Sequence, residues 1–296
     1  MHHPTREDRI AGCLLAGALG DAIGAAFEGH PPNPDIAVPQ NLRFTDDTQL
    51  TIATCESIIE SRTVDPGNIA QQFVKSFLDR QIDGIGASTL KSLMELSAGG
   101  HWASVGAVGE RSAGNGAAMR IAPLAFVLDP DIDSDRRTIR DICRITHRND
   151  EAYAGALAIV RSIRHALAGN PLDDQLISTL TDSVHDSLVR DRLVALKDSS
   201  LSIEDYADRF GTSGYVVDSV PIAILSAVRS SDLVSTFHQI IRCGGDTDTI
   251  ASMFGQIFGA AHGTRALPME VVDLVDDISV VRKTAERFSR VSEARQ

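Results

Sequence analysis

Apolar residues recur at spacings of three and four along almost the whole chain of 296 residues, whereas alternation with a period of two is nearly absent. The first pattern is typical of helices with one buried face, and the second is typical of strands. Ile10, Leu14 and Ala18 form one such stripe, which follows Thr5, a plausible N-cap with Asp8 three residues later. The sequence therefore predicts an all-α fold, in which four glycines between residues 12 and 24 allow close helix packing.

The residue types that favour helix ends divide the chain further. A second helix is expected to begin at the acidic cluster near residue 45 and to end before Arg62, and Asp65-Pro66 provides a cap and a first-turn proline for a third. The stretch 99–116 is rich in Gly, Ala and Ser, which predicts a long loop, while the polar stretch 171–209 fits a peripheral helical pair or an insertion. Further helices are expected over 117–128, 134–146, 150–167 and 231–243, and a final one from 246.

Composition limits the function classes. No repeat or linker divides the chain, so we expect a single domain over residues 1–296. The net charge of −12 and the pI of about 5.1 argue against a nucleic-acid groove, although a small anionic ligand is compatible if metals or backbone amides receive it. The four cysteines are scattered and form no C-x-x-C pair, which indicates neither a zinc ribbon nor a disulfide framework.

The start of the chain lacks a basic region that leads into an apolar stretch, so it does not resemble a secretory signal. No apolar run is expected to reach the roughly 18 residues of a membrane span. We therefore expect a cytoplasmic protein that does not contact a membrane and that acts as a monomer.

Two acidic clusters lie about two hundred residues apart, and each is expected at a helix start. Asp and Thr in that position often serve only as helix caps, and capping is the more common explanation for either cluster alone. Each cluster, however, offers two carboxylates and an adjacent threonine hydroxyl, whereas a cap needs one acceptor. The residues are Thr45, Asp46 and Asp47 in the first cluster and Asp246, Asp248 and Thr249 in the second.

Two such clusters that face each other would hold a pair of divalent cations, because carboxylate and hydroxyl oxygens are ligands for hard ions. Histidine and cysteine are missing from both clusters, so Mg²⁺ or Mn²⁺ fits better than zinc. The sequence therefore predicts a site for two divalent cations, provided that folding brings the clusters together.

Other residues are weaker candidates on their own. Gly114-Asn115-Gly116 can receive phosphate at a helix start, but it is also an ordinary turn. Glu28 ends an apolar stretch, where its carboxylate is either a base or a solvated helix end. His147 either orients substrate or caps a helix, and Tyr215 either stacks on a base or packs in the core.

Taken in their order along the chain, the motifs resemble those of the ADP-ribosylglycohydrolase family over nearly the whole chain. The resemblance runs through Gly20-Asp21-Ala22 and Glu28, the two acidic clusters, the stretch 114–120 and Thr146-His147. It implies an all-α orthogonal bundle with two cations, Mg²⁺ or Mn²⁺, at the bottom of a cleft.

The resemblance also implies an activity and residue roles. The enzyme would cleave the glycosidic bond of ADP-ribose, with Glu28 as the acid/base or water-positioning group and with Asp47 and Asp248 as both catalytic residues and metal ligands. The other implied ligands are Thr45, Asp46, Asp246 and Thr249. The implied substrate-binding residues are Ser112, Gly114, Asn115, Gly116, Met119, His147, Ser213 and Tyr215.

One departure concerns the acceptor. Family members that act on arginine resemble one another in an acidic residue shortly before Gly-Asn-Gly, whereas Ser112 stands in that place here and Glu110 precedes it. Arginine-linked, serine-linked and small-molecule ADP-ribose therefore stay open as substrates, and nucleic acid is expected only as an ADP-ribosylated substrate.

Two other functions use the same features. A two-metal nucleotide phosphohydrolase would need the same carboxylates and phosphate loop. A non-catalytic relative, similar to crystallin-like members of the family, would bind ADP-ribose without turnover. The presence of all six implied ligands and of Glu28 argues against the second.

Overall fold

The computed structural model describes residues 4–33, 41–197 and 199–293. In these ranges every regular element is a helix, and β-pairing is limited to three isolated bridges, which confirms the predicted all-α class. The α-helices are α1 Arg6–Gly24, α2 Asp46–Ser61, α3 Pro66–Leu78, α4 Ala87–Ser97, α5 Trp102–Val105, α6 Asp133–Arg144, α7 Asp150–Leu167, α8 Asp174–Ser183, α9 Leu188–Leu196, α10 Ile203–Phe210, α11 Val216–Arg229, α12 Leu233–Cys243, α13 Thr247–His262, α14 Met269–Val272 and α15 Ile278–Glu293. The 3-10 helices are η1 Ala25–Phe27, η2 Glu110–Ser112, η3 Asn115–Ala117, η4 Ala122–Phe126 and η5 Thr264–Ala266.

Helices α1 and α13 form the centre of the fold and pack against each other more extensively than any other pair. They run antiparallel, since Gly12 lies beside Gly259 and Gly24 lies beside Asp248. A Cβ atom on Gly12 would lie 2.4 Å from the Gly259 carbonyl oxygen, so the two backbones touch where no side chain intervenes. This seam places the C-terminal end of α1 against the first turn of α13, which carries the second acidic cluster.

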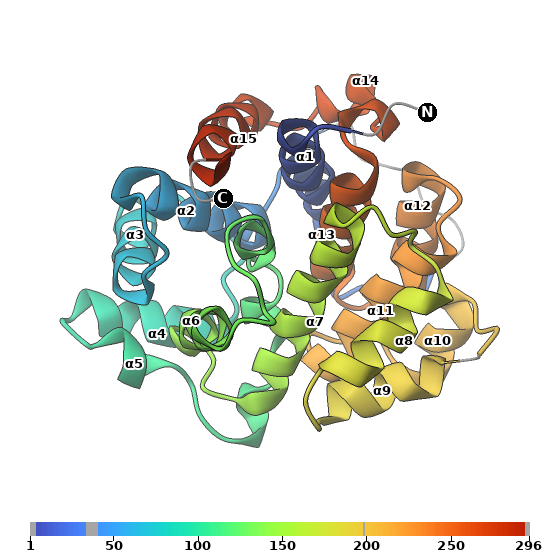
Figure 1. The fold of residues 1–296 in the computed structure, drawn as a ribbon, viewed down its shortest axis with the longest axis horizontal. Helices are drawn as coiled ribbons and strands as arrows, with labels where there is room; N and C mark the ends of the chain where they lie inside the picture. The colour runs from blue at the N-terminus through green and yellow to red at the C-terminus, as the bar shows by residue number, and fades with distance from the viewer. Residues whose placement is uncertain (1–3, 34–40, 198, 294–296) are drawn as a thin grey trace.

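The remaining helices surround this pair. Figure 1 shows α2, α3 and α15 on one side of α1 and α13, and α8, α9, α10 and α12 on the other, with helices running in several directions. Helices α7 and α11 are also largely buried and connect the centre to the second group.

Buried Arg9 holds the far end of the seam together. Its Nη1 atom donates to the carbonyl oxygens of Ala166, Ala260 and Ala261, at the C-terminal ends of α7 and α13. The Ala260 and Ala261 carbonyls lack partners within their own helix, the Ala166 carbonyl also accepts from the Gly169 N–H, and a cation at these ends meets the negative end of each dipole. Arg9 thus joins three helices opposite the acidic clusters.

Most of the predicted helix boundaries are confirmed. Thr5, Asp65 and Asp232 cap α1, α3 and α12 with side-chain oxygens, and Asn149 caps α7. The stretch 99–116 contains the short helices α5 and η2 and the first two residues of η3. The stretch 171–209, expected as a pair or an insertion, contains α8, α9 and most of α10.

Two predictions about the helices are wrong. Residues 117–128 do not form one helix but contain the last residue of η3 and the whole of η4, because Pro123 cannot donate a helical hydrogen bond. These residues are also buried on nearly all faces, so their apolar character does not mark a helical stripe. The helix that starts near residue 246 is not the last one, since α15 follows it.

One apolar segment also corrects an expectation. Within the described residues, Arg6–Phe27 is long and apolar enough to cross a membrane by length and composition alone. In the fold, 78% of its most apolar window is buried, and the core helix of a soluble protein passes the same test.

Candidate metal centre and active site

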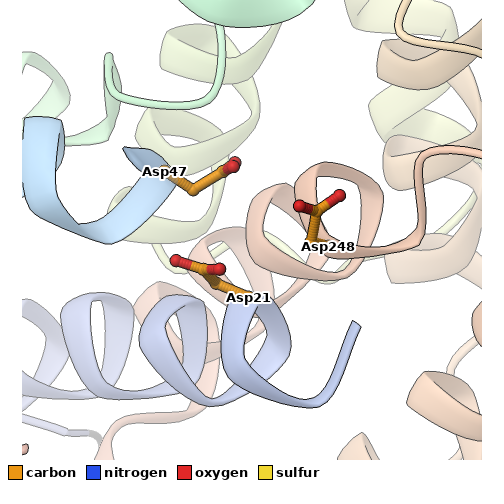
Figure 2. A group of neighbouring side chains, drawn as sticks. All are labelled: Asp21, Asp47 and Asp248. Carbon is orange, nitrogen blue, oxygen red and sulfur yellow. The ribbon is translucent and has the colours of Figure 1, made fainter. Parts of the chain in front are cut away.

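The two acidic clusters lie on facing helix starts. Asp47 is in the first turn of α2, Asp248 is in the first turn of α13, and Asp246 is the N-cap of α13. The Thr249 hydroxyl donates to Asp47 Oδ2 over 3.2 Å and so connects the clusters directly. Figure 2 shows Asp47 and Asp248 together with Asp21 of α1 around one space, and an oxygen of each lies within 4.8 Å of the others. Folding therefore brings the two clusters together.

Asp21 holds the start of α2 in place. Its carboxylate accepts hydrogen bonds from the backbone N–H and the hydroxyl of Thr45, at 3.0 and 2.8 Å, and from those of Thr48, at 3.0 and 2.6 Å. Thr45 itself gives α2 no side-chain cap, so Asp21 serves as the cap from another helix. Because these donors occupy both of its oxygens, Asp21 is a positioning residue rather than a free ligand. Burial raises its pKa to about 6 although the hydrogen bonds oppose this shift.

The carboxylates at the centre destabilise one another's ionised forms. Burial, followed by the charges of Asp21 and Asp248, raises the pKa of Asp47 well above its usual value. Burial and Asp21 raise the pKa of Asp46 to about 8, and burial and Asp246 raise that of Asp248 to about 9. Such shifts arise where like charges share a site with little access to water.

The residues present fit a hard divalent cation. The buried Oδ1 atom of Asp47 has no hydrogen-bond partner, so its lone pairs are available to a ligand. All candidate donors in both clusters are oxygens, which suits Mg²⁺ or Mn²⁺ in six-fold coordination. Cations bound here would offset the mutual repulsion of the carboxylates.

Asp246 is oriented by the Gly-Asn-Gly motif. Asn115 Nδ2 donates to Asp246 Oδ2 over 2.5 Å and to Ser219 Oγ over 3.1 Å. The Asn115 amide is therefore committed to the protein, and its position depends on α11, which carries Ser219. Burial raises the pKa of Asp246. Hydrogen bonds oppose this shift, and the bond with Asp248 opposes it most.

Glu28 stands at the mouth of the same site. It follows η1, is exposed, and has an oxygen within 4.8 Å of oxygens of Asp246 and Asp248. Its turn is tied to the start of α13, because the Gly29 N–H donates to the Gly245 carbonyl over 2.7 Å. Partial burial and then the charge of Asp246 raise the pKa of Glu28.

A cavity of about 240 Å³ opens onto these carboxylates and onto the start of α4. Gly86 gives α4 no side-chain cap, and residues 86–89 line the cavity. The Gly86 N–H lies close enough to the Asp46 carboxylate to oppose the rise in its pKa, and the following amides of the first turn are left for a ligand. The start of an 11-residue helix carries partial positive charge and favours anions.

The cavity reaches most of the predicted site residues. Ser112 is buried and lies outside its lining, the Ser213 hydroxyl donates to Asp218, and Tyr215 is 36% exposed beside Gly114, to which its backbone is bridged. Thr45 and Asp47 are not part of the lining. The predicted residues that line the cavity are Glu28, Asp46, Gly114, Asn115, Gly116, Met119, His147, Asp246, Asp248 and Thr249.

Sequence reasoning gave no role to Asp21, Ser219 or the start of α4. Asp21 carried a detectable signal, because it continues the apolar stripe of the first helix at helical spacing and a carboxylate on a buried face needs partners. Gly86 carried none, since a glycine before a helix is an ordinary turn residue.

The comparisons with known proteins agree with this geometry. The family model for ADP-ribosylglycohydrolase matches residues 2–296. The chain is 30% identical to the ADP-ribosylhydrolase ARH3 of Danio rerio, over 92% of this chain and 89% of that one, and 25% identical to the ADP-ribosyl-[dinitrogen reductase] glycohydrolase of Rhodospirillum rubrum, over 90% of each. A solved structure titled an ADP-ribosylglycohydrolase-related protein complex matches 97% of this chain and 99% of its own, with a TM-score of 0.73 and 25% identity. The resemblance noted in the motifs is thus confirmed, and this chain belongs to the ADP-ribosylglycohydrolase family and is a glycohydrolase enzyme.

Proposed function

We propose that this enzyme is a metal-dependent hydrolase that cleaves the glycosidic bond between ADP-ribose and an acceptor and releases free ADP-ribose. The observation that carries the proposal is the meeting of two acidic helix starts beside a cavity that also contains the uncapped start of α4. The names of the relatives, which include an ADP-ribosylhydrolase, support the same substrate class.

Two divalent cations, Mg²⁺ or Mn²⁺, suit the donor set. When bound, they supply positive charge that fixes and polarises the ribose hydroxyls. Asp21 keeps one half of the ligand set in position, because it anchors both Thr45 and Thr48. The ligands would be Thr45, Asp46, Asp47, Asp246, Asp248 and Thr249.

Glu28 provides the proton transfer. Its carboxylate holds the attacking water and accepts a proton from it as the water oxygen bonds to the ribose C1″ atom. The acceptor leaves with the electron pair of the broken bond, and Glu28 returns the proton to it. The raised pKa of Glu28 lies closer to neutral pH than that of an ordinary carboxyl group, which suits a group that first accepts and then returns a proton. An oxygen of Glu28 lies within 4.8 Å of oxygens of Asp246 and Asp248, which supports a role beside the ribose that the cations would hold.

The diphosphate would lie between the start of α4 and the Gly-Asn-Gly motif, since residues of both line the cavity. The first-turn amides of α4 bring partial positive charge without a basic side chain. This arrangement lets a protein with a net charge of −12 bind an anionic ligand.

The acceptor side lacks a carboxylate in the place where arginine-specific relatives are expected to have one. Ser112 stands there and lies outside the cavity lining, while the preceding Glu110 is exposed. We therefore propose that the enzyme does not depend on a guanidinium pairing at this position and acts on oxygen-linked ADP-ribose, such as that on serine.

The proposal is tested with a panel of arginine-linked, serine-linked and carboxylate-linked ADP-ribosyl peptides. Each peptide is incubated with the enzyme in Mg²⁺, in Mn²⁺ and in chelator, and the products are separated by chromatography. We expect metal-dependent release of free ADP-ribose, with the serine-linked peptide as the best substrate. Glu110→Gln serves as a control, because it removes the acidic residue that precedes Ser112 in the sequence and leaves the proposed metal ligands unchanged.

Other products would change the assignment. Release of AMP or inorganic phosphate would identify a two-metal phosphohydrolase instead. Metal-dependent ADP-ribose binding without turnover of any peptide would identify a non-catalytic relative. A strong preference for the arginine-linked peptide that Glu110→Gln abolishes would show that Glu110 supplies the missing acid.

A further inference from the structure

His147 is held by a chain of hydrogen bonds that the proposed mechanism does not use. Arg120, which is 1% exposed, donates from Nη2 to Thr146 Oγ1 over 2.7 Å, and the same hydroxyl lies 2.8 Å from His147 Nδ1. A second guanidinium nitrogen of Arg120 donates to the Gly116 carbonyl. Arg120 thus connects the Gly-Asn-Gly motif to the imidazole that faces it.

The direction of the bond between Thr146 and His147 follows from the donors available. A guanidinium can only donate, so the Thr146 oxygen accepts from Arg120, and its single proton points elsewhere. Among the described residues, His147 Nδ1 is the one other partner of this hydroxyl. If Nδ1 were the donor, the Thr146 proton would be buried without an acceptor, which is costly. Thr146 therefore donates to Nδ1.

We propose that Arg120 and Thr146 are positioning residues that fix His147 in the tautomer with its proton on Nε2, so that a neutral N–H donor faces the ligand cavity. The identity of the ligand atom rests on the proposed function: a donor requires an acceptor, here a phosphate or ribose oxygen of ADP-ribose.

The position of the ring supports this assignment. A Cβ atom on Gly114 would lie 3.1 Å from His147 Nε2, and one on Gly116 would lie 2.9 Å from Cε1. The imidazole therefore fills the space that the two missing side chains leave, and all three residues line the cavity. Nε2 bonds to no other described residue, which leaves it for a ligand. Burial, with the charge of Arg120, lowers the pKa of His147 to about 3, which is consistent with a neutral ring.

The tautomer is measured directly by two-dimensional ¹⁵N–¹H NMR of the histidine side chains in the ligand-free protein. The His147 signals are those absent from His147→Gln. We expect a protonated Nε2 and an unprotonated Nδ1 in the wild type, and the same pattern in Thr146→Ser, which keeps the hydroxyl. Thr146→Val keeps the side-chain shape but lacks the hydroxyl, so its His147 signals should move toward the other tautomer.

Calorimetric titration with ADP-ribose supplies the second readout. Thr146→Val should bind roughly tenfold more weakly, the effect of one weakened hydrogen bond to a charged group, and Thr146→Ser should bind like the wild type. A wild-type His147 protonated on Nδ1 would overturn the inference, even if Thr146→Val fails to fold, and so would a Thr146→Val protein with unchanged tautomer and affinity. A wild type that has the Nε2–H tautomer but binds no ADP-ribose would refute the proposed function alone.

Discussion

Gly24→Ala offers a direct test of how the α1–α13 seam builds the candidate metal centre. A Cβ atom on Gly24 would lie 2.4 Å from Asp248 Cα and 2.5 Å from Asp248 N. Both are backbone atoms that cannot rotate away. Ordinary contact begins at 3.4 Å, so the first turn of α13 must move by about 1.0 Å. That shift carries Asp248 away from Asp21 and Asp47.

The cost in stability should be modest and the cost in metal binding large. Overpacking of this kind costs about 1–3 kcal/mol, and the better helix propensity of alanine returns about 1 kcal/mol of that. Functional sites tolerate displacements of only about 0.5 Å, so a 1.0 Å shift of one ligand exceeds the tolerance. We expect the affinity for Mn²⁺ to fall by at least about tenfold.

Gly12→Ala is the matched control. It lies on the same helix against the same partner, and its Cβ atom would meet the Gly259 carbonyl oxygen at the same distance of 2.4 Å. It is, however, about 18 Å further from the acidic clusters along the helix axis. Urea unfolding in chelator should show similar destabilisation of both variants, whereas Mn²⁺ calorimetry should separate them. Equal Mn²⁺ affinity in the two variants would refute the link between the seam and the site.

Three further predictions concern the charges of the site. Because the pKa values of Asp46 and Asp248 are raised, the folded metal-free protein keeps protons that the unfolded chain releases above about pH 4. Its free energy of unfolding should therefore fall as pH rises from about 4 to about 9. Urea midpoints that rise over this range in chelator would contradict this prediction. Asp248→Asn should lose metal binding and turnover. Its metal-free stability should fall less steeply with pH than that of the wild type, because one of the two groups with a raised pKa is gone. Urea midpoints and Mn²⁺ calorimetry on the same samples test both expectations. Glu28→Gln should keep Mn²⁺ and ADP-ribose affinity but hydrolyse substrate about 10²- to 10⁴-fold more slowly, and a normal rate in single-turnover kinetics would exclude Glu28 as the base.

The sequence predicts those parts of the fold that local interactions decide. Asp65 and Asp232 cap helices with their own side chains, and such caps are visible as Asp or Ser before an apolar stripe. The acidic clusters were found for the same reason, since they stand at the starts of α2 and α13. Their meeting in space could only be proposed, because it depends on the α1–α13 seam.

The parts that sequence reasoning missed depend on distant partners. Helix α11 contains Pro221, which local rules treat as a helix breaker, and buried surroundings override that preference. Asp21 caps a helix other than its own, so no spacing rule connects it to Thr45. The role of Arg120 likewise exists only once Thr146 and Gly116 lie beside it.

The helix starts at the site differ from most others in this fold in a way that links stability to function. Helices α1, α3, α5, α7, α8, α9, α10 and α12 are capped by their own N-cap side chains, whereas α2, α4 and α13 are not, and outside this group α6, α11 and α14 also lack such a cap. The uncapped starts of α2, α4 and α13 meet at one cavity, where their dipoles face the carboxylates of the acidic clusters. The dipoles offset only part of the repulsion, since the pKa values of Asp46 and Asp248 stay raised. We expect this remaining repulsion to favour the binding of divalent cations by the folded protein over the unfolded chain, so that added cations raise the free energy of unfolding.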